Sequence, residues 1–162
     1  MKRIAAFFAA LSLLAGAASA ENFSAGFVDI NNPWIRATPR GAGVAGAFMT
    51  IVNRGTEPER LIGGSIAGVS RFEFHRMVMD GNVAKMRPVE GGLEIKPGQS
   101  VALTPGSIHV MLIGLKQPFQ QRQHVKGTLM FEKAGKVDVE FTVESMGASA
   151  PGQSLPMEHT GH

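Results

Sequence analysis

The 162-residue sequence contains no cysteine, and this absence excludes several kinds of site. Without thiols there is no disulfide, so the fold must depend on its hydrophobic core alone. A thiol oxidoreductase, a cysteine nucleophile and a cysteine-based zinc site are excluded. A blue-copper electron carrier is excluded as well, because its copper needs a thiolate ligand.

Other features are absent too. No patch of basic residues interleaved with aromatic ones is present, which argues against nucleic-acid binding. Beyond residue 20, no segment is apolar over the length that a membrane helix needs. We find no Ser–His–Asp pattern, no convincing carboxylate pair and no phosphate-binding glycine loop, so we do not expect an enzyme.

The first 20 residues have the pattern of a secretory signal peptide. A basic start, Met1–Arg3, precedes an almost wholly apolar run over residues 4–15, and Ala18–Ala20 is a small-residue cleavage site. The apolar run is too short for a transmembrane helix. A retained N-terminal anchor is the alternative, but the pattern favours an exported protein whose mature chain begins at Glu21.

Most of the remaining chain is typical of strands and turns. Strand composition or alternation is found at residues 48–53, 71–75, 100–103, 108–113, 125–131 and 136–143. Turn signals, among them Gly63-Gly64 and Asp80-Gly81, fall between these segments at short spacing. This pattern predicts an all-β fold, a single antiparallel β-sandwich domain that covers residues 21–144.

The stretch "FHRMVMDGNVAKMRP" combines a histidine with three methionines around an Asp-Gly pair. If Asp80-Gly81 forms a two-residue type I′ turn, His75 lies directly opposite Met86, and both project to one side of the sheet. A three-residue loop would instead pair His75 with Arg87. The interpretation therefore depends on the register of the hairpin.

A second His–Met pair occurs in "SIHVMLIG". On a strand, His109 and Met111 point to one face, and the core-forming side chains to the other, namely Ile108, Val110 and Leu112. If the hairpin lies beside this strand, two histidines and two methionines converge.

Each of these residues also has an ordinary structural explanation. A lone strand histidine is often a satisfied polar residue, and methionine adapts to irregular gaps in a core or at its rim, as expected of Met49, Met77, Met79 and Met130. His124, in a polar run, is most simply a solvated loop residue. The occurrence of two His–Met pairs on one face nevertheless favours a metal site.

The chemistry of the four side chains selects the ion. Thioether sulfur is a soft, neutral ligand and imidazole is borderline, so a site of two methionines and two histidines selects Cu(I) over zinc, calcium or magnesium. No thiolate locks the ion in place, which suits capture and release. Catalysis is disfavoured, because saturated coordination leaves no open position for a substrate.

These residues resemble the signature of the periplasmic copper(I) chaperones of the PCu(A)C family: a His, ten residues, a Met, about twenty-one residues, then His-x-Met. Ten residues separate His75 from Met86, and twenty-two separate Met86 from His109. The extra residue falls most simply at Gly91-Gly92. The segments "PWIRATP" and "MDGNVAKMRPVEGGLEIKPGQSVALTPGSIHVMLIGLKQP" also resemble this family.

The resemblance implies a cupredoxin-like, immunoglobulin-like sandwich that binds one Cu(I) through His75, Met86, His109 and Met111. It also implies a periplasmic metallochaperone that passes copper to the copper-bearing subunit of a cytochrome c oxidase, or to another periplasmic copper chaperone. We expect the protein to be a monomer. A copper sequestration protein without a dedicated acceptor is the alternative. A third possibility is a structural or adhesive sandwich whose methionines only pack.

Residues 145–162 differ in composition from the rest of the chain. They are rich in Gly, Ser, Ala and Pro and have almost no large apolar residue, so we expect a flexible tail. The tail carries Met157, His159 and His162, which match in kind the Met- and His-bearing extensions of some members of the PCu(A)C family. We predict a secondary Cu(II) site there; a tail with incidental histidines is the alternative.

Overall fold

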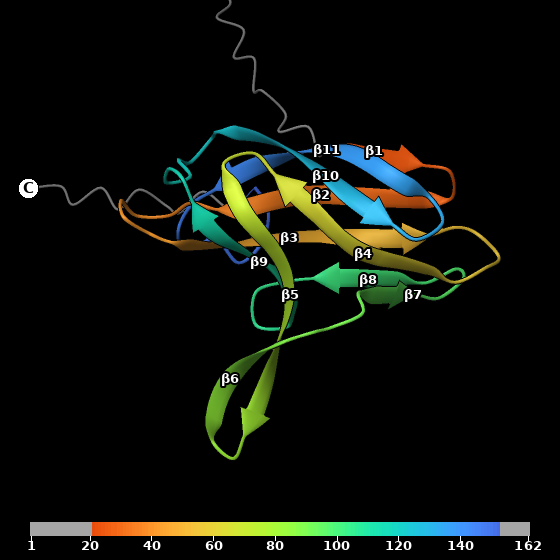
Figure 1. Ribbon diagram of the computed structural model, residues 1–162, viewed down its shortest axis with the longest axis horizontal. Helices are drawn as coiled ribbons and strands as arrows, with labels where there is room; N and C mark the ends of the chain where they lie inside the picture. The colour runs from red at the N-terminus through yellow and green to blue at the C-terminus, as the bar shows by residue number, and fades with distance from the viewer. Residues whose placement is uncertain (1–20, 153–162) are drawn as a thin grey trace, which may run out of the picture.

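The computed structural model describes residues 21–152, and within that part of the chain it contains strands and turns but no helix (Figure 1). The expectation of an all-β fold is confirmed. The strands are β1 (Asn22–Ala25), β2 (Val28–Arg36), β3 (Val44–Asn53), β4 (Glu59–Ile66), β5 (Val69–Asp80), β6 (Val83–Pro88), β7 (Leu93–Ile95), β8 (Ser100–Leu103), β9 (Ile108–Leu115), β10 (His124–Phe131) and β11 (Gly135–Glu144). Over residues 21–152 there is accordingly no helix long and apolar enough to cross a membrane.

The strands follow one another in the order β6-β5-β9-β3-β2-β11-β10-β4-β7, with β1 added to β2 and β8 added to β3. Every pairing is antiparallel except that of β2 with β11, which is parallel and aligns Trp34 with Thr142. The expectation of a purely antiparallel sheet is therefore wrong at this pair. Parallel strands need a long connection, and the whole of the chain between β2 and β11 supplies it.

The hydrophobic core follows from the alternation along the strands. In β11 the buried residues are every second one, Val137, Val139, Phe141 and Val143, and the residues between them are not buried. The inward side chains of the other strands join them in one cluster, of which Ile30, Ile51, Leu112 and Leu129 are fully buried members. Truncation of such a residue to alanine costs about 2–5 kcal/mol.

Several segments differ from the sequence-based expectation. Gly63-Gly64, expected as a turn, lies inside β4. A Cβ on Gly64 would come within 2.9 Å of both the Phe72 ring and the Thr128 carbonyl, so this glycine allows close packing rather than a turn. The expected strands also omit β1, β2, β4 and β7. In β2, Asn32, with a φ of 49°, and the following proline interrupt the strand pattern where the pairing with β3 shifts register.

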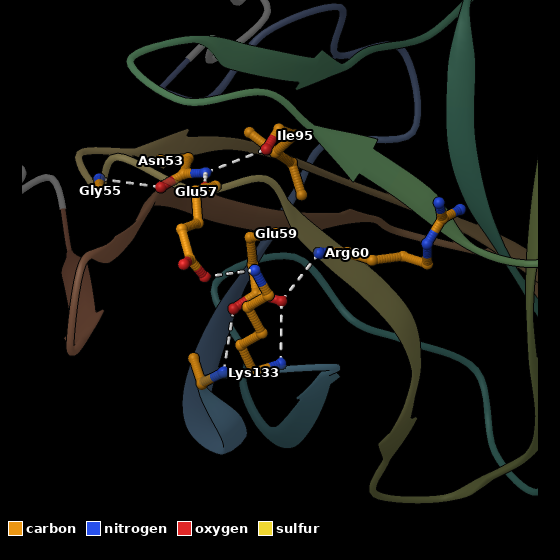
Figure 2. A network of polar contacts seen from close by, with 8 residues as sticks. Asn53, Gly55, Glu57, Glu59, Arg60, Ile95 and Lys133 are labelled. Atoms are coloured by element: carbon orange, nitrogen blue, oxygen red, sulfur yellow. Dashed lines mark hydrogen bonds and ion pairs between the residues drawn. The ribbon is translucent and has the colours of Figure 1, made fainter.

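A network of polar contacts ties the loop after β3 to the turn between β10 and β11 (Figure 2). The buried Glu59 carboxylate accepts backbone N–H bonds from Arg60 at 2.8 Å, Lys133 at 3.0 Å and Ala134 at 2.9 Å. Burial alone would raise the pKa of Glu59, but these three hydrogen bonds outweigh it and hold the pKa below its ordinary value. Because every oxygen of Glu59 is satisfied, this network is structural.

The hairpin of β5 and β6 projects from the body of the molecule (Figure 1). The first part of β5, from Val69 to Arg76, pairs with β9, whereas the outer part pairs with β6 alone. All of β6 is exposed to solvent. The hairpin is thus held by β9 at its base and by its own pairing beyond it.

Residues 145–152 are the part of the expected tail that the structure describes, and part of this segment is buried against the rest of the domain. Ala148 is 1% exposed and packs with Trp34 and Phe48, whose rings are 4.4 Å apart between centroids. Nε and Nη2 of Arg36 donate to the Ala148 carbonyl oxygen, at 3.1 and 2.5 Å. Ala148 therefore holds this segment against β2 and β3.

Candidate metal centre

Two histidines face each other across the pairing of β5 with β9. His75 lies directly opposite His109, and the ring centroids are 6.3 Å apart. Glu73 lies opposite Met111 on the same face, whereas the alternate residues, such as Phe74 and Val110, point into the core. The prediction that His109 and Met111 share the face away from the core is confirmed.

The register of the hairpin differs from both predicted alternatives. The two loop residues are Gly81 and Asn82, so His75 lies opposite Pro88, while the residue opposite Met86 is Met77. Gly81 has a φ of 62° and comes first in the loop, as in a type II′ turn. The type I′ turn at Asp80-Gly81 is therefore wrong, because Gly81 occupies the first rather than the second position of the turn.

The error leaves Met86 on the predicted face. The partner of His75 moves by two residues, from Met86 to Pro88, and a shift by two preserves the side of the sheet on which each residue lies. Met86 becomes a diagonal neighbour of His75 and lines a pocket of about 330 Å³ with His109 and Met111. Other residues that line the pocket include Arg36, Phe48 and Met77.

His109 is held with one ring nitrogen available. Its Nδ1 donates to the Ser107 carbonyl at 3.1 Å, so the neutral ring has an unprotonated Nε2. Burial lowers the pKa of His109, the bond to Ser107 opposes this, and the charges of His75 and Arg36 lower the pKa further. His109 is therefore neutral at pH 7, which is the form that binds a metal.

His75 is oriented by an acidic neighbour. Its Nε2 lies 3.0 Å from Oε2 of Glu73, and this hydrogen bond lowers the pKa of Glu73. Nδ1 of His75 is buried and has no hydrogen-bond partner among the described residues. Buried polar atoms without a partner are rare in folded proteins, so this nitrogen marks His75 as a candidate metal ligand.

The sequence interpretation missed three residues of this site. Met77 lines the pocket, Glu73 binds His75, and Arg36 lies with its guanidinium carbon 5.6 Å from the centroid of the Phe48 ring at the pocket wall. Glu73 and Met77 were detectable, because both are two residues from His75 and alternation places them on its face. Arg36 comes from β2 and is brought near only by the fold.

His124, the third histidine of the described residues, lies away from this site. His124, expected in a loop, is the first residue of β10, and its Nδ1 lies 3.0 Å from Oε1 of Glu140. With Glu21 these side chains offer ligand atoms within 4.8 Å of one another, but two carboxylates are hard donors that do not favour Cu(I). The predicted tail ligands Met157, His159 and His162 lie outside the described residues.

Fold and site together define an all-β domain with soft, uncharged donors gathered beside a projecting hairpin. The LpqE-like family, described as "Putative lipoprotein LpqE-like", matches residues 28–143, and the chain belongs to this family. A curated relative, "Putative lipoprotein Lxx21020" of Leifsonia xyli, is 27% identical over 122 residues, which are 75% of this chain and 72% of the relative.

Solved structures of copper domains are similar to this chain. The copper-bound PCuAC domain from PmoF2 has a TM-score of 0.66 and 29% identity, over 77% of this chain and 98% of that domain. The solution structure of CuI-DR1885 from Deinococcus radiodurans has a TM-score of 0.59 and 25% identity, over 80% of this chain and 85% of the other. The resemblance to the PCu(A)C family is confirmed.

Proposed function

We propose that this protein is a copper metallochaperone that binds one Cu(I) through His75, Met86, His109 and Met111. The observation that carries the proposal is the direct opposition of His75 and His109, each with a free ring nitrogen, beside a pocket lined by Met86 and Met111. The copper-bound relatives support the choice of metal.

The donor set suits an ion that is carried and then given up. All four proposed ligands are uncharged and hold Cu(I) less tightly than a thiolate would, so the ion can pass to a site with stronger donors. Met86 is 50% exposed on a projecting strand, so an acceptor reaches this ligand without opening the core. Copper is therefore cargo in this proposal, and no catalytic step is assigned to the site.

We further propose that the protein acts in the periplasm after export and delivers Cu(I) to the copper-bearing subunit of a haem–copper oxidase or to another periplasmic chaperone. Membership of a family described as lipoproteins supports export. Sequestration of copper without a dedicated acceptor uses the same site and differs only in the fate of the ion.

Competition between metals tests the binding step. Under anaerobic conditions, mature protein should take up one equivalent of Cu(I) from a chromophoric Cu(I) chelator. Excess Zn(II) should not displace the bound Cu(I). Met86→Leu, which keeps volume but removes sulfur, should lower the Cu(I) affinity about tenfold or more. Met146→Leu is the matched control, because Met146 is also exposed, at 61%. Zinc binding equal to copper binding would sink the proposal.

Delivery is tested with the loaded protein. Cu(I)-loaded protein mixed anaerobically with the copper-free soluble copper domain of an oxidase subunit should lose its copper to that domain, as followed by the copper content of the two proteins after their separation. Retention of Cu(I) by protein that binds it stoichiometrically would favour sequestration instead.

A further inference from the structure

The outer half of the hairpin carries three methionines on one face. Met77 and Met79 alternate along β5 and so point to the same side, and Met86 of β6 lies opposite Met77. Met79 lies opposite Ala84, whose side chain is small. The three side chains form a group that begins at the pocket and runs outward along the hairpin.

Packing does not account for this group. Met79 is 66% exposed and Met86 is 50% exposed, and β6 buries none of its residues. Met49, by contrast, is 2% exposed and does fill the core. The expectation that Met79 fills a core or a rim is therefore wrong, and its thioether is free to meet a ligand.

The spacing allows three sulfur atoms to reach one small ion. Directly opposed residues such as Met77 and Met86 have Cβ atoms about 4.5–5.5 Å apart, and diagonal neighbours such as Met79 and Met86 about 7–8 Å. Methionine has three rotatable bonds, so its sulfur covers the remaining distance. A set of thioethers alone is soft and neutral, which selects Cu(I).

We propose that Met77, Met79 and Met86 form an outer Cu(I) position, through which the ion leaves the inner site. This inference rests on the proposed function of Cu(I) carriage. Met86 belongs to both positions, so the ion moves by ligand exchange. The Cu–N bonds to His75 and His109 are replaced by Cu–S bonds to Met77 and Met79, and the Cu–S bond to Met111 also breaks, which leaves Cu(I) bound by three thioethers. The copper remains Cu(I) throughout, and no electron or proton is transferred. Met79 is the outermost ligand and the first that an acceptor meets.

The rate of copper release tests the outer position. Cu(I)-loaded mature protein is mixed anaerobically with bathocuproine disulfonate, and the absorbance of the product is followed by stopped flow. The Met79→Leu variant keeps side-chain volume and all four proposed inner ligands, and Met79 does not line the pocket. Its release rate should fall about tenfold, while its equilibrium affinity changes less than about threefold.

The matched control is Met146→Leu, since Met146 is 61% exposed, close to the 66% of Met79, but lies after β11. This variant should release copper at the wild-type rate. If Met79→Leu also releases copper at the wild-type rate, the outer position does not exist, although the carrier function stands.

A second measurement detects the outer position directly. His75→Ala/His109→Ala removes both imidazoles of the inner site, and the three thioethers should still bind Cu(I) weakly, in roughly the micromolar range. Adding Met77→Leu and Met79→Leu should abolish that residual binding. Complete loss of binding in the double histidine variant would overturn the outer position. Wild-type protein that binds no Cu(I) at all would instead overturn the proposed function.

Discussion

Val89 donates its backbone N–H to the carbonyl oxygen of Phe74, at 2.8 Å, where the hairpin leaves the body. At the other end, the loop residue Gly81 has a φ of 62°. These two features fix the register of β6 at its base and at its tip. The position of Met86 relative to His75 depends on both, because β5 is the only strand within residues 21–152 that pairs with β6.

Substitution of Gly81 should disturb the metal site without affecting the core. Gly81→Ala places a side chain at a positive φ, which costs about 1–2 kcal/mol. Because β6 is exposed, the strain should fray the hairpin, raise its amide hydrogen exchange and lower the Cu(I) affinity by roughly threefold to tenfold. Gly68→Ala is the control, since Gly68 has a φ of 78° in the turn between β4 and β5 and, like Gly81, has room for a Cβ.

Gly68→Ala should lower the melting temperature and leave the Cu(I) affinity unchanged. Equal losses of affinity in both variants would show that the hairpin turn has no particular part in placing Met86.

The stability of the copper-free protein should depend on the protonation of His109. Its pKa is lowered from 6.5 in the folded state, chiefly by burial, so below about pH 6.5 the unfolded chain binds a proton that the folded chain does not. The free energy of unfolding should therefore fall as the pH drops from 6.5 toward the lowered pKa, as measured by urea titration.

His109→Asn should remove this pH dependence, because the amide does not titrate and can still donate to the Ser107 carbonyl. If the free energy of unfolding of His109→Asn falls with pH as steeply as that of the wild type, groups other than His109 cause the pH dependence.

The Glu59 network should contribute to stability and not to copper binding. Glu59→Gln replaces a carboxylate oxygen that accepts backbone N–H bonds with an amide nitrogen that cannot accept, and should cost about 1–3 kcal/mol in chemical denaturation. Glu57→Gln, which breaks an exposed ion pair with Lys133, should leave the stability close to that of the wild type, because solvent screens exposed charges. Both variants should bind Cu(I) with wild-type affinity; a loss in Glu59→Gln would link the network to the site.

Truncation after Gly152 tests the predicted Cu(II) site in the tail. Truncation after Glu144 would remove the buried Ala148 and the carbonyl that accepts from Arg36. The shorter deletion should leave the melting temperature and Cu(I) binding unchanged and abolish a second, weaker Cu(II) event in calorimetry. Full-length His159→Ala/His162→Ala should reproduce that loss. A second Cu(II) event that persists in the truncated protein would exclude the tail as its site.

The sequence alone determined the all-β fold and the face that carries the metal-binding candidates. Strand alternation has a period of two, so His109 and Met111 are assigned to one face wherever the strand lies, and Val110 and Leu112 to the other. The same periodicity placed Met86 on the face of His75 even though the predicted turn was wrong. The exclusion of thiol chemistry required only the composition.

Only the tertiary structure decided which partners surround that face. The turn type depends on the backbone conformation at Gly81, which an Asp-Gly-Asn sequence leaves open, and the choice moved Met77 opposite Met86. Arg36 reaches the pocket because β2 and β9 both pair with β3, and the sequence contains no local signal for such long-range pairing. The parallel pairing of β2 with β11 was hidden for the same reason, because the pattern of a strand records which face is buried but not which strand lies beside it.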